Sequence, residues 1–190
     1  MMNKDTQILI HDVASLMFLL PFSTLCMADV LFGYTVYPMF LTHAVTTYMS
    51  YDLLWISLQP KVIHAYKTLI ITHHLICLLA VIRPLMYPEE SGIITLCGIV
   101  EIDTTILTLR RIIPRTSSIH PYINLLYYLT NAMIRVVYET LLTLFMIQYY
   151  AHESILVKIH VLGCQYFINI FSCGVCLLTY SKRNPALKNH

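Results

Sequence analysis

The chain has 190 residues, of which 57% are hydrophobic and only 12% are charged, and its mean hydropathy is +0.67. A soluble domain of this length needs more charge to cover its surface, so the composition excludes an ordinary soluble protein. The net charge of +2 is too small for a nucleic-acid groove, and we expect no nucleic-acid partner. All six cysteines lie inside apolar runs, which argues against a secreted disulfide framework. The sequence therefore predicts an integral membrane protein.

Six apolar runs follow one another along the chain, each long enough to cross a bilayer as a helix of about 20 residues. They show no sustained alternation of period two, so helices are favoured over a closed barrel. We expect an all-α polytopic protein, a single domain over residues 1–190. The expected spans are 8–32, 37–58, 66–86, 92–112, 121–149 and 155–180. Pro, Gly or charged residues mark the breaks, and the fifth run is longer than a bilayer requires.

The positions of Lys and Arg predict the direction of these spans. With the N-terminus in the cytosol, nine basic residues fall on the cytosolic side and only Arg83 and Lys158 on the other. The nine are Lys4, Lys61, Lys67, Arg110, Arg111, Arg115, Lys182, Arg183 and Lys188. This bias predicts an even number of spans and two cytosolic termini.

Charged and strongly polar residues lie inside the expected spans, where each is costly unless it faces a protein interior. They are Asp12, Asp52, His73, His74, Glu101, Asp103, Asn131, Arg135, Glu139 and Asn169. At a rise of about 1.5 Å per residue, Asp52, His73 and Asp103 lie roughly 9–14 Å inside the cytosolic ends of their helices. Different helices thus supply polar groups to one layer. One-sided polar stripes on several helices predict that they gather around a polar interior.

Each polar residue can either bond helices together or act on a ligand, and both interpretations stand for Asn131, Asn169 and Arg135. The adjacent pair His73-His74 favours a functional interpretation, and one of the two rings can face a cavity while the other packs. Asp103 lies almost opposite Glu101 on its helix, so the two acids cannot both line one narrow cavity. We expect one of them to pair with a neighbouring helix.

Several short motifs follow one another along the chain. They are Tyr51-Asp52-Leu53-Leu54, His73-His74, Glu101-Ile102-Asp103-Thr104-Thr105 with Leu109-Arg110, then Asn131 with Arg135, and Asn169. Their order resembles that of the TLC-domain family. The resemblance covers the chain from the first span to about Tyr180. The family includes ceramide synthases and translocating-chain-associated membrane proteins. It implies a bundle of helices around a lipid-accommodating cavity in the endoplasmic reticulum membrane. The stretch at Glu101 lacks the His-Asp pair of ceramide synthases, so this chain is more similar to the smaller TLC proteins.

Two functions are expected. In the first, the chain transfers an acyl group from acyl-CoA, as co-substrate, to a lipid amine or hydroxyl. The catalytic candidates are His73, His74, Asp52 and Glu101, and the substrate-binding candidates are Asp103, Asn131, Arg135 and Asn169. In the second, the chain is a non-enzymatic lipid-binding, lipid-transport or membrane-composition protein. A channel or a metal enzyme ranks lower, because neither a Gly-rich filter nor a histidine box is present. We expect a membrane lipid as partner, no bound cofactor and no metal, and leave a homo-oligomer open.

Overall fold

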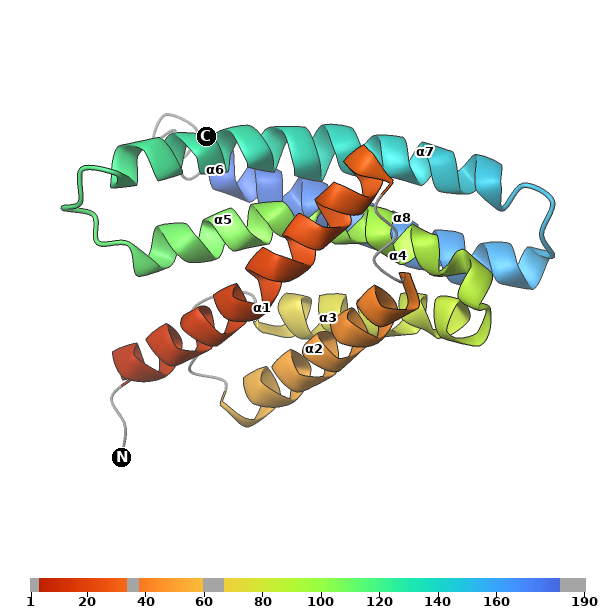
Figure 1. Cartoon of the computed structure of the whole chain (residues 1–190), viewed down its shortest axis with the longest axis horizontal. Coiled ribbons are helices and arrows are strands. Elements are labelled where there is room, and N and C mark those ends of the chain that lie inside the picture. The colour runs from red at the N-terminus through yellow and green to blue at the C-terminus, as the bar shows by residue number, and fades with distance from the viewer. Residues whose placement is uncertain (1–3, 34–37, 60–66, 182–190) are drawn as a thin grey trace, which may run out of the picture.

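A computed structural model describes residues 4–33, 38–59 and 67–181, and these ranges are helical with no strand (Figure 1). The all-α fold class is confirmed. The elements are α1 (Lys4–Phe32), α2 (Pro38–Leu58), α3 (Lys67–Met86), the 3-10 turn η2 (Pro88–Glu90), α4 (Ser91–Gly98), α5 (Glu101–Ile112), α6 (His120–Ala132), the π-helix η3 (Met133–Tyr138), α7 (Glu139–Tyr149) and α8 (Ile155–Ser181). Four of the basic residues that orient the chain, Lys61, Lys182, Arg183 and Lys188, lie outside the described ranges.

The helices run back and forth along one direction (Figure 1). Helices α1, α3 and α6 begin, and α2, α5 and α8 end, at the same end of the molecule, on the left of the figure. We call this the basic end, because α5 carries Arg110 and Arg111 there. The opposite end, which holds Glu90 and Tyr150, is the far end. The described helices therefore alternate in direction, and the prediction that the basic end faces the cytosol stays a prediction.

Four helical stretches are long and apolar enough to cross a membrane, which supports an integral membrane protein with several spans. They are Asp5–Phe32, Lys67–Met86, His120–Tyr149 and Ile155–Ser181. The bent pair of η2–α4 and α5 makes a fifth if the two halves form one span. Helix α2 has 21 residues, but His43, Asp52 and its Thr and Ser residues make it more polar than these stretches. The count of six spans stays a prediction.

The expected span over 92–112 is not one straight helix, because the chain bends by 41° between α4 and α5. The amides of Ile99, Val100 and Ile102 each bond a carbonyl three residues back, a tight 3-10 pattern rather than an α-helical one. Gly98 ends α4 where α1 approaches closely, and a Cβ there would lie 2.5 Å from the Sγ of Cys26. The bend places Glu101 and Asp103 in the first turn of α5.

The overlong fifth run is one helix from His120 to Tyr149, interrupted only by the π-helical turn η3. π-turns are rare and occur often at functional sites. This one contains Arg135, whose side chain is buried.

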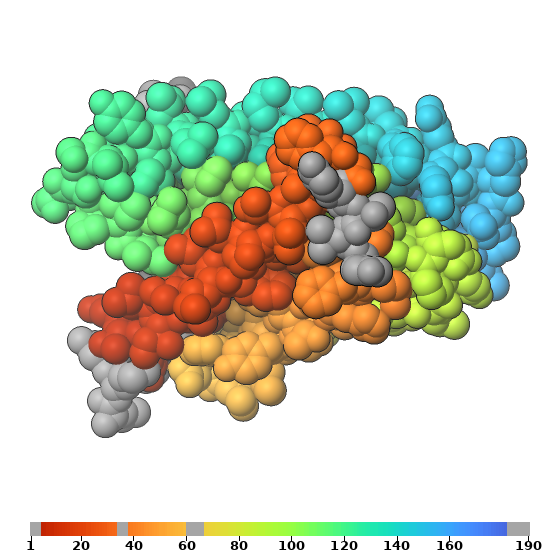
Figure 2. Space-filling view, viewed as in Figure 1, coloured from red at the N-terminus to blue at the C-terminus, as the bar shows by residue number. Residues whose placement is uncertain are grey.

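Apolar side chains make up both the interior and the outer surface. One core cluster includes Phe22, Leu41 and Met49, and a second includes Leu142 and Met146. Large apolar side chains are also exposed along α1, α2, α6 and α8. In Figure 2, α1 lies obliquely across one face of the molecule, with α2 on one side of it. An apolar exterior around a partly polar interior is the pattern of a protein surrounded by lipid.

Candidate functional site

A cavity of about 420 Å³ runs inside the bundle, within the range of about 300–1,000 Å³ typical of small-molecule sites. At the basic end it is lined by polar groups that include Asp12 and Arg111, and at the far end by Pro84 and Tyr150. Along α3 the lining extends from Leu69 to Pro84, which corresponds to roughly 20 Å of helix. The cavity is therefore elongated, with a polar and an apolar end.

Asp52 of α2 is the centre of the polar end. Its Oδ1 lies 2.7 Å from Nε2 of His11 on α1, and its Oδ2 lies 2.8 Å from Nε2 of His74 on α3. The other ring nitrogen of His74 lies 2.8 Å from the carbonyl oxygen of Ile70, one turn earlier. Asp52 and His74 are both buried. One carboxylate thus joins three helices.

The polar cluster continues toward the basic end through His11. Its Nδ1 lies 3.6 Å from Oδ1 of Asp12, which in turn accepts a hydrogen bond of 2.8 Å from the guanidinium of Arg111. Arg111 is half-exposed, so the cluster extends from the interior to the basic end. Sequence reasoning missed His11. The signal was its depth, since it lies seven residues beyond Lys4, roughly 10 Å along the helix and level with the predicted polar layer.

His73 also lines the cavity, but its ring nitrogens are held differently from those of His74. The ring stacks on Phe171 of α8, with centroids 4.2 Å apart, and meets His74 edge to face at 5.7 Å. Its nitrogens contact only the Sγ of Cys77, at 3.7 and 3.9 Å, and form no ion pair among the described residues. A thiol is a weak hydrogen-bond partner, so the imidazole of His73 can bind another group.

Glu101 and Asp103 lie on opposite sides of α5, as the sequence predicts. Glu101 lines the cavity and makes no ion pair within 4 Å in the described part of the chain. Asp103 is fully buried and does not line the cavity. Its Oδ2 accepts from Nε of Arg135 at 2.5 Å and from Nδ2 of Asn131 at 3.2 Å. Asp103 is therefore the acid that pairs with a neighbouring helix.

The remaining candidates mainly join helices. Asn131 is fully buried against Asp103, whereas Arg135 lines the cavity and donates to Thr104 at 2.9 Å. Asn169 of α8 donates to Thr143 of α7 at 2.9 Å and does not line the cavity. Three of the substrate-binding candidates predicted from the sequence thus contact neighbouring helices and do not line the cavity: Asp103, Asn131 and Asn169.

Glu139 lies deeper in the cavity and is 1% exposed. Gln165 of α8 donates to its Oε1 at 2.8 Å, and Oε2 has no hydrogen-bond partner among the described residues. Arg135, one turn away, pairs with Asp103 and not with Glu139. A buried carboxyl with one unbonded oxygen is a place where a ligand can donate a hydrogen bond.

A second ion-pair cluster lies beside the far end of the cavity, and its Arg83 and Glu90 do not line the cavity. Arg83 donates to both carboxylate oxygens of Glu90 at 2.5–2.8 Å, and the phenol of Tyr150 donates to Glu90 at 2.7 Å. The guanidinium also lies 4.8 Å from the ring centroid of Tyr87. These contacts fix the Tyr150 side chain that lines the far end.

Comparisons with models of protein families, with curated proteins and with solved structures found no match to this chain. Within the described ranges, no three or more His, Cys, Asp or Glu side chains group together as a metal ion would require.

Proposed function

We propose that this chain binds a long-chain lipid in its internal cavity and transfers an acyl group from acyl-CoA to an amine or hydroxyl of that lipid. The observation that carries the proposal is a single cavity that joins the Asp52–His74 cluster to an apolar far end. In this proposal the chain crosses the membrane six times, α2 is the most polar span, and both termini lie in the cytosol. The membrane is that of the endoplasmic reticulum, as the resemblance to TLC proteins implies.

The shape of the cavity suits an amphiphile. Its far half is lined by Val81, Ile93, Met146 and other apolar side chains. Burial of a hydrocarbon chain there contributes about 0.8 kcal/mol per methylene relative to water. A polar head that moved past Glu139 into that half would lose its hydrogen bonds, so it stays between Glu139 and the Asp52–His74 cluster. The lipid is thus held in one orientation.

His73 is the residue best suited to act as general base. Its imidazole accepts the proton of the lipid amine or hydroxyl as that nitrogen or oxygen attacks the thioester carbonyl carbon. The carbon–sulfur bond then breaks, and the CoA thiolate leaves with the proton that His73 returns. Asp52 stabilises positive charge on His74, which meets His73 edge to face. Arg110 and the half-exposed Arg111 at the basic end can bind CoA phosphates, whereas Arg135 is buried and pairs with Asp103.

A second candidate function is lipid binding without turnover. It is favoured by the polar contacts of His74, because both of its ring nitrogens already meet acceptors within the protein. A histidine held in this way cannot remove a proton from a head group. The same cavity would then serve lipid storage, transport or sensing.

The test uses the full chain, purified in phosphatidylcholine nanodiscs with labelled palmitoyl-CoA and candidate long-chain amines and alcohols. We expect an acylated product that His73→Ala abolishes and that His152→Ala, in the exposed loop before α8, leaves unchanged. Equal turnover by His73→Ala and the wild type would exclude His73 as the base. A retained lipid without any product would favour the second function.

A further inference from the structure

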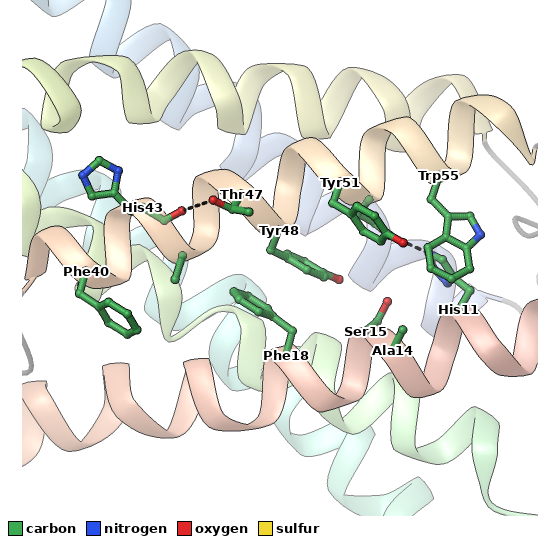
Figure 3. A pocket seen from close by; sticks show the side chains of 12 residues that line it. His11, Ala14, Ser15, Phe18, Phe40, His43, Thr47, Tyr48, Tyr51 and Trp55 are labelled. Atoms are coloured by element: carbon green, nitrogen blue, oxygen red, sulfur yellow. Dashed lines mark hydrogen bonds and ion pairs between the residues drawn. The ribbon is translucent and has the colours of Figure 1, made fainter.

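A second pocket, of about 520 Å³, lies between α1 and α2 (Figure 3). Its rim is exposed and includes Ala14, Phe40, His43 and Tyr51, while Ser15 in its floor is buried. We call this pocket the α1–α2 groove. Helix α1 packs far more extensively on α5 than on α2, which leaves room for the groove.

The groove and the internal cavity share part of their lining. His11, Ser15, Tyr48 and Asp52 line both. Phe18, which lines only the groove, stacks on Tyr48 with centroids 4.4 Å apart and an angle of 4° between the rings. Figure 3 shows these two rings facing each other between the helices, with His11 and Trp55 toward one end and Phe40 and His43 toward the other. The stacked pair therefore stands where the two spaces meet.

We propose that the α1–α2 groove is a lateral opening through which a lipid chain passes from the bilayer into the cavity, with Phe18 and Tyr48 as its gate. This inference rests on the proposed function, since it needs a lipid inside the cavity. Two stacked rings on different helices can separate by rotation of their side chains, which opens a path between α1 and α2. A chain lying between α1 and α2 would then be level with Asp52.

The chemistry of the groove selects the occupant. It contains no Lys or Arg, and its one acid, Asp52, is buried. A phosphate-bearing molecule such as acyl-CoA is therefore disfavoured there and finds its complement at the basic end, near Arg110 and Arg111. Apolar walls that face the surrounding lipid suit a hydrocarbon chain. The two substrates of the proposed reaction thus reach the Asp52–His74 cluster by separate routes.

The test follows a palmitate that carries a diazirine and an alkyne, added to the full chain in phosphatidylcholine nanodiscs and photolysed at increasing times. Labelling of peptides that contain Met146 and Val161, which line the cavity but not the groove, measures passage into the interior. Ala14→Trp fills the groove from α1, and we expect it to slow labelling of these peptides several-fold. Met17→Trp is the matched control, because Met17 is 75% exposed on the same helix and lines neither space.

A second variant is expected to speed up labelling, which a misfolded protein would not do. Phe18→Ala removes half of the gate, and we expect faster labelling of the Met146 and Val161 peptides than in the wild type. Equal labelling rates in the wild type, Ala14→Trp and Phe18→Ala would overturn the lateral opening and leave the proposed function intact. If neither peptide is labelled in the wild-type protein, no lipid chain enters the cavity, and both proposals are wrong.

Discussion

Replacing Asp103 by Asn tests whether the buried ion pair with Arg135 holds two parts of the bundle together. Asp103 is fully buried in the first turn of α5, and its carboxylate accepts from Arg135, Asn131 and Thr130. All three donors lie in α6 or η3, on the next long helix. The variant keeps the shape of the side chain but leaves the guanidinium without its counterion.

The expected loss is large, because removal of one partner of a buried ion pair typically costs about 3–5 kcal/mol. For a chain of this size, 1 kcal/mol corresponds to about 2–4 °C, so we expect the melting temperature of Asp103→Asn to fall by about 10 °C. Arg135 is 7% exposed and cannot regain the lost interaction from bulk water.

Thermal unfolding is measurable with a thiol-reactive dye, because Cys26 and Cys164 are buried and all six cysteines are free. The control is Glu153→Gln, which removes a carboxylate that is 43% exposed and 3.5 Å from Arg83. An exposed pair of this kind contributes about 0–1 kcal/mol. If Asp103→Asn and Glu153→Gln melt at the same temperature, Arg135 does not depend on Asp103 and the assignment of this pair is wrong.

Two further substitutions test packing at the bend and at the far end. Gly98→Ala places a Cβ against Cys26, so we expect a loss of about 1–3 kcal/mol in the same melting assay, whereas Gly92→Ala has nothing within 4 Å and should melt like the wild type. Tyr150→Phe removes the hydrogen bond to Glu90, with an expected cost of about 1.5–3 kcal/mol. Burial, and then the Glu90 carboxylate, raise the pKa of Tyr150 well above its usual range. The wild-type advantage should therefore be complete below about pH 10 and shrink at higher pH, and a constant advantage would contradict this cause.

The sequence predicted those elements whose limits depend on local signals. The expected spans 66–86 and 155–180 agree with α3 and α8 to within one residue, because each is an apolar run that stops where the composition changes. The bend at Ile99 and the π-turn around Arg135 could not be predicted in the same way. The bend accompanies the close approach of α1 at Gly98, and a single sequence does not say which helix will lie against that glycine.

The same division holds for the site. Depth along each helix predicted that Asp52 and His73 share a layer, and helical period predicted that Asp103 turns away from Glu101. Neither depth nor period says which helices are neighbours. The pairing of Asp52 with His11, and of Arg135 with Asp103 rather than Glu139, depends on that order and was therefore open until the helices were placed.

The hydrogen-bond donors and acceptors around Asp52 indicate that His73 and His74 have different roles. The carbonyl of Ile70 can only accept, so the Nδ1 of His74 must carry a hydrogen, and a neutral imidazole then has none on Nε2. Nε2 lies 2.8 Å from a carboxylate oxygen of Asp52, and two acceptors cannot bond each other directly. A second proton must therefore lie between Nε2 of His74 and the carboxylate. His74 and Asp52 thus form a closed unit whose polar atoms already have partners. His73 contacts only a thiol through its nitrogens, and it is the imidazole that a lipid head group in the cavity can reach.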